Sequence, residues 1–425
     1  MRKRNRVWKA VTFLPFILFL IIGASMGHAE EARVKESSCV RCHTDLGGVY
    51  AEPITGLQES VHAEQEVACH DCHGGDPTSF DEDEAHSTTK DFVGRPSFEE
   101  IPEFCARCHS DSNRMKRYNL RTDQLDLYKT SHHGQLLYEK KDPNTATCVS
   151  CHGVHEIKSS DNPLSMVFKA NIPETCAQCH SDSGRMEKYK TSVDQYDQYV
   201  RSAHGKMLLE KGDPRAPTCS DCHGVHSASP PGYKDIAATC EMCHGAIAKL
   251  FKESPHYYEQ TSEEAARCVD CHGDHNVSHA TTVLYDGEDE GHCGSCHEPD
   301  SKQARLAQLI KGRVEAGINE VENAQNMLKQ VTGSGKNLEK LEEAFETAQS
   351  ELIKARAATH TLSMDQINEH IGLVIEEGKK VEQASAGIVK ELSGRRKGAI
   401  FVLTILGVII ALVYVKIRTL EMPRE

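Results

Sequence analysis

Nine copies of a Cys-x-x-Cys-His pattern lie between residues 39 and 297, and they hold all 18 cysteines of the chain. Two thiols at this spacing add across the two vinyl groups of a haem, and the adjacent histidine then lies where it binds the iron. The cysteines predicted to bind haem are Cys39, Cys42, Cys69, Cys72, Cys105, Cys108, Cys148, Cys151, Cys176, Cys179, Cys219, Cys222, Cys240, Cys243, Cys268, Cys271, Cys293 and Cys296. The proximal iron ligands predicted with them are His43, His73, His109, His152, His180, His223, His244, His272 and His297.

Zinc sites and disulfide frameworks also use paired cysteines. Here every pair carries its histidine, and no cysteine is left over for a disulfide or a free nucleophile. The pattern therefore predicts nine covalently attached haems c with their irons, because neither alternative explains nine complete copies.

The histidines outside the motifs suffice to give each iron a second axial ligand. Four recur in a Ser-x-His segment, and we predict them as distal ligands: His62, His133, His204 and His256. Three follow a proximal histidine in Cys-His-Gly-x-His: His155, His226 and His275. A residue so placed does not reach its own iron easily, so we predict that these three bind the iron of a neighbouring haem.

Two haems have less certain partners in the sequence. The second motif is followed by Gly74-Gly75-Asp76 and lacks the extra histidine, so His86 is the nearest substitute. For the ninth motif, three histidines compete: His279, His292 and His360. Met115 and Met186 recur in a Ser-Asp-Ser-x-Arg-Met segment and are the alternatives to histidine as axial ligands. Methionine is more often a packing residue.

The motifs are arranged in repeats. Residues 105–155 align without a gap to 176–226, with 29 identities in 51 positions. Looser copies cover about 39–73 and 240–275, and the ninth motif stands alone. Four haem pairs plus one haem is the simplest description of residues 30–297.

Composition is consistent with such a chain. Aromatic residues are only 6% and the formal charge is −14. Buried macrocycles would supply the hydrophobic stabilisation that few side chains offer, and we expect mainly α-helical and irregular structure with little β. The acidic surface disfavours nucleic-acid binding and favours basic partners.

Both ends of the chain carry apolar segments. Residues 1–29 read as a secretory signal, with a basic start, a 13-residue apolar run and a small-x-small site. Near the other end, residues 398–415 are uncharged and just long enough to cross a bilayer as a single transmembrane helix. We expect residues 30–394 on the periplasmic, extracytoplasmic side and a cytoplasmic tail at 416–425.

Between the motifs and that segment, residues 298–394 show helical periodicity. Apolar residues recur at three-and-four spacing from Leu306 to Leu328, Thr332 to Gly335 interrupts them, and a capping box begins at Ser363. We expect an antiparallel α-helical bundle that serves as a spacer or joins copies of the chain into an oligomer.

The repeated Ser-x-His-Gly, Asp-Pro and Thr-Cys-x-x-Cys-His-Gly-Val-His units resemble the bacterial multihaem cytochromes c of anaerobic respiration, and the haem pairing is similar to the cytochrome c554 and c3 families. The resemblance covers about residues 36–297. It implies bis-histidine haems in close pairs, periplasmic assembly, and electron relay from a membrane quinol oxidase to a terminal reductase or metal acceptor.

Two departures narrow what the resemblance implies. Quinol dehydrogenases of this kind anchor through an N-terminal helix, whereas the anchor predicted here is C-terminal. Residues 358–362 are similar to the helical regions of pentahaem nitrite and octahaem hydroxylamine enzymes, but Cys-x-x-Cys-Lys, frequent at the former's catalytic haem, does not occur.

Three functions follow as hypotheses. The first is a membrane-anchored electron-transfer cytochrome that is no enzyme and whose partners are other redox proteins. The second is a reductase of nitrite, hydroxylamine or a sulfur oxyanion, with one open haem at His73 or His297. The third is a structural cytochrome subunit whose helices organise a respiratory complex. High-spin haem would separate the second from the first.

Overall fold

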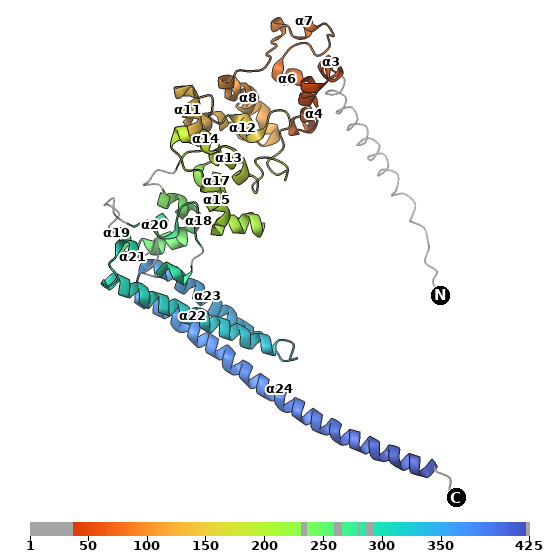
Figure 1. The fold of residues 1–425 in the computed structure, drawn as a ribbon, viewed down its shortest axis with the longest axis vertical. Helices are drawn as coiled ribbons and strands as arrows, with labels where there is room; N and C mark the ends of the chain where they lie inside the picture. The colour runs from red at the N-terminus through yellow and green to blue at the C-terminus, as the bar shows by residue number, and fades with distance from the viewer. Residues whose placement is uncertain (1–36, 231–235, 259–265, 279–280, 286–292, 422–425) are drawn as a thin grey trace, which may run out of the picture. The chain divides into compact units, whose positions relative to one another are not determined.

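The computed structural model describes residues 37–230, 236–258, 266–278, 281–285 and 293–421. The described residues are mainly helical and include no strand, as the composition predicts (Figure 1). The chain divides into two compact units. Unit 1 comprises the residues up to Tyr233 together with His275–Val277, and unit 2 comprises Lys234–Asp274 and Ser278–Glu425. The predicted secretory signal, His279 and His292 lie outside the described residues.

Unit 1 consists of short helices joined by turns and loops. Its α-helices are α3 (Ser38–Leu46), α4 (Glu52–Gln58), α5 (Val61–Glu64), α6 (Cys69–His73), α7 (Glu82–Ala85), α8 (Ile101–His109), α9 (Ser112–Met115), α10 (Gln124–Thr130), α11 (His132–Lys140), α12 (Cys148–His152), α13 (Ile172–His180), α14 (Ser183–Met186), α15 (Gln195–Arg201), α16 (Ala203–Gly205) and α17 (Cys219–His223). A π-helical turn, η6 (Lys206–Glu210), continues α16. Its side-chain core is small, since its largest hydrophobic cluster of buried residues is Tyr199, Leu208 and Ala216.

Backbone hydrogen bonds join one repeat to the next at equivalent positions. The N–H of Val61 donates to the carbonyl of Ile157, and the N–H of His132 donates to the carbonyl of Ala228. Donor and acceptor of the second bond each lie 71 residues after those of the first, which is the offset between the repeats. Ala203 donates in the same way to Val277. Three of the four Ser-x-His segments, those of His62, His133 and His204, are thus held against the segment that follows the second motif of the next repeat.

Unit 2 combines short motif-bearing helices with three long ones. The elements are α18 (Ile236–Phe251, kinked at His244), α19 (Pro255–Tyr258), α20 (Cys268–His272), η7 (Thr282–Tyr285), α21 (Cys293–Cys296), α22 (Lys302–Val331), α23 (Glu339–Ala358), η8 (Thr359–Thr361) and α24 (Met364–Glu421). The long helices α22, α23 and α24 pack together as the periodicity predicts (Figure 1).

A cluster of buried residues lies at the end of this bundle where α23 turns into α24. Ile310 and Val314 of α22 pack there against Ala355 of α23 and against Ile367 and Ile371 of α24. The first turn of α22 is capped by Ser301, and the helix stops at Val331, just before the Thr332–Gly335 segment that contains two glycines with positive φ. The periodic residues Ile310 and Val314 are therefore on the buried face of α22, whereas Leu309 is exposed.

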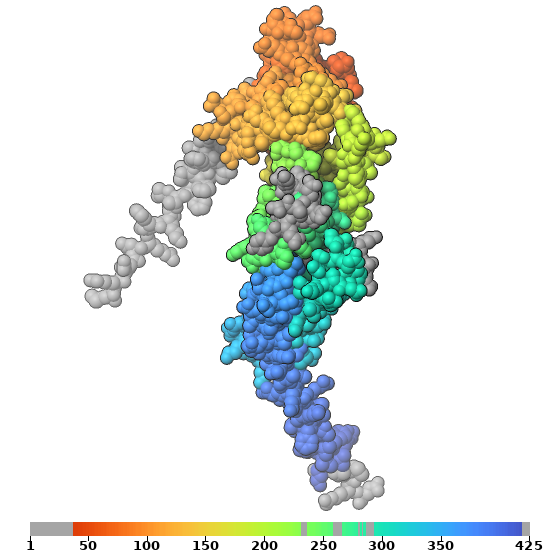
Figure 2. Space-filling model, turned by 90° about the vertical axis from the view of Figure 1, so that its left-hand side faces the viewer, coloured from red at the N-terminus to blue at the C-terminus, as the bar shows by residue number. Residues whose placement is uncertain are grey.

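The last part of α24 differs from the rest of the bundle. It contains an 18-residue window with a mean hydropathy of 2.8, and none of that window is buried. Figure 2 shows this end of the helix in dark blue, standing clear of α22 and α23. The described chain thus has one helix that is long and apolar enough to cross a membrane.

A buried carboxylate connects α23 with α24. Glu351 accepts hydrogen bonds from Lys354 at 2.6 Å and from Nδ1 of His370 at 2.8 Å, and only 8% of it is exposed. The hydrogen bond from Lys354 lowers the pKa of Glu351 below its ordinary 4.5, against the burial that raises it, and His370 adds to the lowering. His370, which the sequence does not assign as a ligand, is therefore a packing partner in the bundle.

Replacing Glu351 by Gln is expected to lower the free energy of unfolding of the bundle by about 2 kcal/mol at pH 7, because a charged buried hydrogen-bond acceptor is lost. A carboxylate whose pKa is lowered by folding stabilises above its unfolded pKa, and that stabilisation disappears as the pH falls through the folded pKa. The difference between the two proteins should therefore shrink below about pH 4.5. Urea unfolding at pH 7 and pH 4 measures it, with the exposed Glu346→Gln as control. An equal loss at both pH values would contradict the expectation.

Candidate functional site

The second motif of each repeat forms a five-residue helix with its own start signal. In α6, α12, α17 and α20, the backbone N–H before the first cysteine donates to a side chain between the two cysteines, at 2.7–3.1 Å. The motif itself thus closes the start of its helix. The accepting residues are Asp71, Ser150, Asp221 and Asp270.

A glycine ends each of these helices directly after the proximal histidine. The φ angles of Gly74, Gly153, Gly224 and Gly273 lie between 68° and 89°, a backbone region that favours glycine. The chain therefore leaves the helix at once. In the three motifs that continue as Gly-x-His, this turn carries the next histidine away from the proximal histidine of its own motif and towards that of another.

The Ser-x-His segments are also built by a local rule. The hydroxyls of Ser60, Ser131 and Ser202 cap α5, α11 and α16 by accepting the N–H three residues further on, and all three serines are buried. The histidine is therefore the second residue of a capped helix. The capping role of this serine was not among the predictions from the sequence, although the serine recurs two residues before each of these histidines.

The residues after His133 and His204 are glycines, and there is no room for a side chain at either position. A Cβ at Gly134 or Gly205 would lie 1.9 Å from the carbonyl oxygen of Tyr128 or Tyr199, respectively. Each tyrosine is itself held by a hydrogen bond of 2.8 Å from its hydroxyl to a carbonyl, that of Ala146 or of Pro217. The close approach brings the Ser-x-His helix against the preceding helix.

The central geometric result concerns pairs of histidine rings. Eight motif histidines each face a histidine from elsewhere in the chain, with ring centres 5.9–6.3 Å apart. Two imidazoles on opposite sides of one metal ion have ring centres about 6 Å apart, because a metal–nitrogen bond is about 2 Å and each ring centre lies about 1 Å behind its nitrogen. The spacing therefore fits an iron between each pair. The pairs are His43–His86, His73–His155, His109–His62, His152–His226, His180–His133, His223–His275, His272–His360 and His297–His256.

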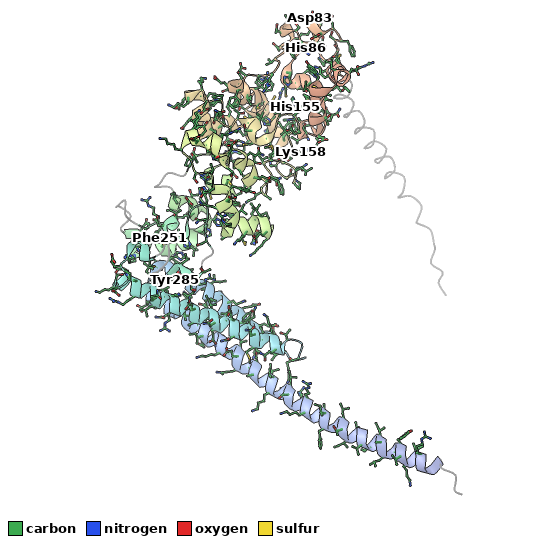
Figure 3. The ribbon with its side chains drawn as sticks, viewed as in Figure 1. Asp83, His86, His155, Lys158, Phe251 and Tyr285 are labelled. Carbon is green, nitrogen blue, oxygen red and sulfur yellow. The ribbon has the colours of Figure 1, made fainter. Side chains whose placement is uncertain are left out.

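Most of the predicted distal histidines take part, and they do so across repeats. His62 and His133, from the Ser-x-His segments, each face the first-motif histidine of the following repeat. His155 and His226 face the second-motif histidine of the preceding repeat, and Figure 3 shows His155 in the loop after α12. No histidine of these pairs faces the motif of its own segment, so the repeats are interlocked.

His86 lies elsewhere than the sequence suggests. We expected it as the substitute partner of the second motif, but it faces His43 of the first motif, and His155 faces His73. The reason is local. The backbone N–H of Asp76 donates to the carbonyl of Ala85, and that of Ser38 donates to the carbonyl of Pro77, so the loop that carries α7 folds back onto α3 (Figure 1).

His360 is a second such case. It was one of three competitors for the ninth motif, but it faces His272 of the eighth, while His256 faces His297 of the ninth. His360 lies in η8, between α23 and α24, and its Nδ1 is 3.0 Å from the carbonyl of Ala357. That hydrogen bond leaves Nε2 as the nitrogen available to a metal. The helical bundle thus contributes directly to the site.

The remaining predicted residues are placed as follows. His204 belongs to unit 1 and His244 to unit 2, and the ligand role of His204 stays a prediction from the repeat. Met115 and Met186 are buried in α9 and α14, with 5% and 6% exposed.

Burial also gives the histidines the protonation state that a metal ligand needs. It lowers the pKa of His133 and His152 to about 4, and the imidazole that each ring faces adds to the shift. A histidine must be neutral to bind a metal, so these rings are ready to do so at neutral pH.

Buried polar atoms give a further test of whether the site fits haem. Oε1 of Gln124 and, at the equivalent repeat position, Oε1 of Gln195 are buried without a hydrogen-bond partner. Buried polar groups are normally hydrogen-bonded. Their recurrence in two repeats fits a polar cofactor group, such as a haem propionate, as the missing partner.

Contacts among the cysteines show which attachment sites are neighbours. Within a repeat, the first cysteines of the two motifs lie close together, in the pairs Cys105–Cys148, Cys176–Cys219 and Cys240–Cys268. Between repeats, burial raises the pKa of Cys72 and of Cys151, and the nearby thiols of Cys108 and Cys179 add to the shifts. Cys69 and Cys271 have pKa values of about 11 from burial, with Cys39 and Cys293 as close neighbours. Within each unit, the attachment sites thus follow one another in sequence order.

Two models of cytochrome families match parts of the chain. The model of the cytochrome c3 family matches residues 61–181, a stretch that contains four complete motifs. The model of the cytochrome c554 and c-prime family matches residues 23–74, which contain the first two motifs. No curated protein matches the chain significantly.

Proposed function

The chain belongs to the multihaem cytochromes c, and from that premise we propose that it is a membrane-anchored periplasmic relay that carries electrons through nine bis-histidine haems in anaerobic respiration. Covalent haem c and electron transfer are properties of the family. Each haem, when bound, supplies a centre that gains and loses one electron reversibly.

The pairing of histidine rings is the observation that carries the proposal. Eight motif histidines already have a histidine opposite them at the spacing of a shared metal ion. Two axial imidazoles leave an iron no position for substrate, which suits electron transfer and not chemistry on a bound molecule. For the one haem left over, we propose His204 as a ligand from its place in the repeat.

The same observation removes the reason for proposing a reductase. The suspected open haems were those of His73 and His297, for which the sequence offers no clear partner. His155 lies opposite His73 and His256 lies opposite His297, at ring distances of 6.3 Å and 6.1 Å. A purely structural role for the helical bundle is likewise less well supported, because His360 on that bundle faces His272.

We further propose that residues 398–415 anchor the chain in the membrane. These residues are exposed in α24, and Arg395, Arg396 and Lys397 precede them. c-Type cytochromes are extracytoplasmic, so the haem-bearing part lies outside the cytoplasm. A chain that ends at residue 397 should be released into the soluble periplasmic fraction, and its retention in carbonate-washed membranes would contradict the anchor.

The bundle also bears on the electron partners. From Met364 to Gly398, α24 runs for 35 residues without a break, which is about 50 Å at 1.5 Å per residue. His360 lies just before the start of this stretch. The haem nearest the bundle is therefore held far from the apolar segment, and we propose that another redox protein, a quinol oxidase on one side or a terminal reductase on the other, exchanges electrons with it.

Protein-film voltammetry of the haem-loaded full chain tests the relay. The proposal expects reversible one-electron signals whose size is unchanged by nitrite, hydroxylamine or sulfite. A catalytic current with any of the three would contradict the relay and favour a reductase.

A further inference from the structure

Two arginines make a contact that the electron relay as proposed does not use. Arg114 and Arg185 occupy the same place in the repeated Ser-Asp-Ser-x-Arg-Met segment. Their Nη1 atoms donate to Sγ of Cys108 and Cys179, respectively, at 2.6 Å and 2.8 Å. In each case the sulfur belongs to the second cysteine of the first motif in the repeat, the atom that becomes bonded to haem.

The short helices α9 and α14 aim these side chains. The carboxylates of Asp111 and Asp182 cap the helices by accepting the backbone N–H of Arg114 and Arg185 at 3.3 Å and 3.1 Å. Met115 and Met186, one residue later, are buried and hold the helices down. The arginine side chain therefore turns back over the motif that precedes it, in both copies.

The position marks the junction between two repeats. Cys108 is close to Cys72 of the preceding motif, and Cys179 is close to Cys151. Second motifs have no cation six residues after their second cysteine, where Thr78, Ile157, Ala228 and Val277 stand. At each of these two junctions, the arginine is therefore present beside the first motif of the later repeat and absent beside the second motif of the earlier repeat.

Attachment of haem changes what the arginine faces. With haem bound, the thiol would be a thioether, which carries no charge, and the guanidinium would lie beside the attached cofactor. Two carboxylates lie nearby, Asp111 and Asp71, and both attract Arg114. Asp111 is committed to the helix cap and Asp71 to its own motif helix, so the charge of Arg114 is only partly offset.

We propose that Arg114 and Arg185 raise the reduction potential of the haems attached at Cys105–Cys108 and Cys176–Cys179. A nearby positive charge favours the form of the haem with one positive charge fewer, which is the reduced form. These two haems then hold an electron more readily than they would without the arginines. Both side chains are exposed, so the effect weakens as salt is added.

The test is an EPR-monitored potentiometric titration of full-length R114Q and R185Q, each loaded with haem. In each variant, one haem should become easier to oxidise, with its ratio of oxidised to reduced form rising about tenfold at a fixed potential, or 59 mV for a one-electron couple. The double variant should move two haems. The haem count by pyridine haemochrome and the low-spin signals should be unchanged.

Two variants control for charge and for place. R114K keeps the charge and should keep most of the potential, and R117Q removes an equal charge from an exposed side chain that stacks on Tyr118. If R114Q and R185Q shift no haem, or shift one no more than R117Q does, the proposal is overturned. A loss of one haem from R114Q would overturn it as well, because the arginine would then serve attachment.

Discussion

Replacing His360 by Ala is expected to leave one haem high-spin and open to carbon monoxide, with all nine haems still attached. His360 faces His272 with ring centres 6.0 Å apart, at the spacing of two imidazoles on one iron. Attachment depends on the thiols of Cys268 and Cys271, which this change does not touch. The measurement is the carbon monoxide difference spectrum of the reduced protein, together with EPR of the oxidised protein.

His370→Ala is the matched control for this variant. It removes a histidine from the same bundle, but one that pairs with Glu351. It should weaken the bundle and leave every haem low-spin. A His360 variant that binds no carbon monoxide and shows no high-spin signal would contradict the ligand role of His360, and the bundle would then be a spacer.

Replacing Gly134 by Ala is expected to destabilise the haem-bearing part of the chain by about 3 kcal/mol or more, because a side chain is forced into a site without space. The added Cβ would lie 1.9 Å from the carbonyl oxygen of Tyr128, and backbone atoms must move to relieve the clash. The helix that begins at His132 would shift, and with it His133. A fall in the melting temperature, and weaker low-spin signal from one haem, measure the two effects.

Gly372→Ala gives the opposite expectation. Gly372 lies inside α24, and a Cβ there would meet nothing within 4 Å. Alanine in an exposed helix interior is more favourable than glycine by about 1 kcal/mol, so the bundle should become slightly more stable. If Gly134→Ala left the melting temperature as high as this control does, the close approach to Tyr128 would not be part of the folded protein.

The sequence predicts the parts of the site that follow local rules. A Cys-x-x-Cys-His motif needs five residues, and the histidines of the Ser-x-His and Cys-His-Gly-x-His segments recur at fixed places in the repeat. Which ring faces which is not local. It depends on contacts such as Val61 to Ile157 and His132 to Ala228, which join residues 96 positions apart.

His86 and His360 show where the pattern ends. Neither belongs to a repeated segment, so recurrence carries no information about either. His86 is brought to His43 by a loop that folds back onto α3, and His360 is placed by the packing of three long helices. In both cases tertiary structure, and not spacing, decides the partner.

The helical region follows its periodicity closely. The glycines at 333 and 335 end α22, as their conformational freedom predicts. The one difference lies at residues 395–397, where two segments were expected. The structure has a continuous helix, Met364–Glu421, because Arg395, Arg396 and Lys397 include no residue that breaks a helix.

Low-temperature EPR of the oxidised, haem-loaded protein, with the haem count checked by pyridine haemochrome, tests the central claim most directly. If nine histidine pairs hold nine haems, only low-spin signals accounting for nine haems will appear. A distinct high-spin signal that shifts when nitrite or hydroxylamine is added would contradict a closed relay, since it would show a haem with an open position.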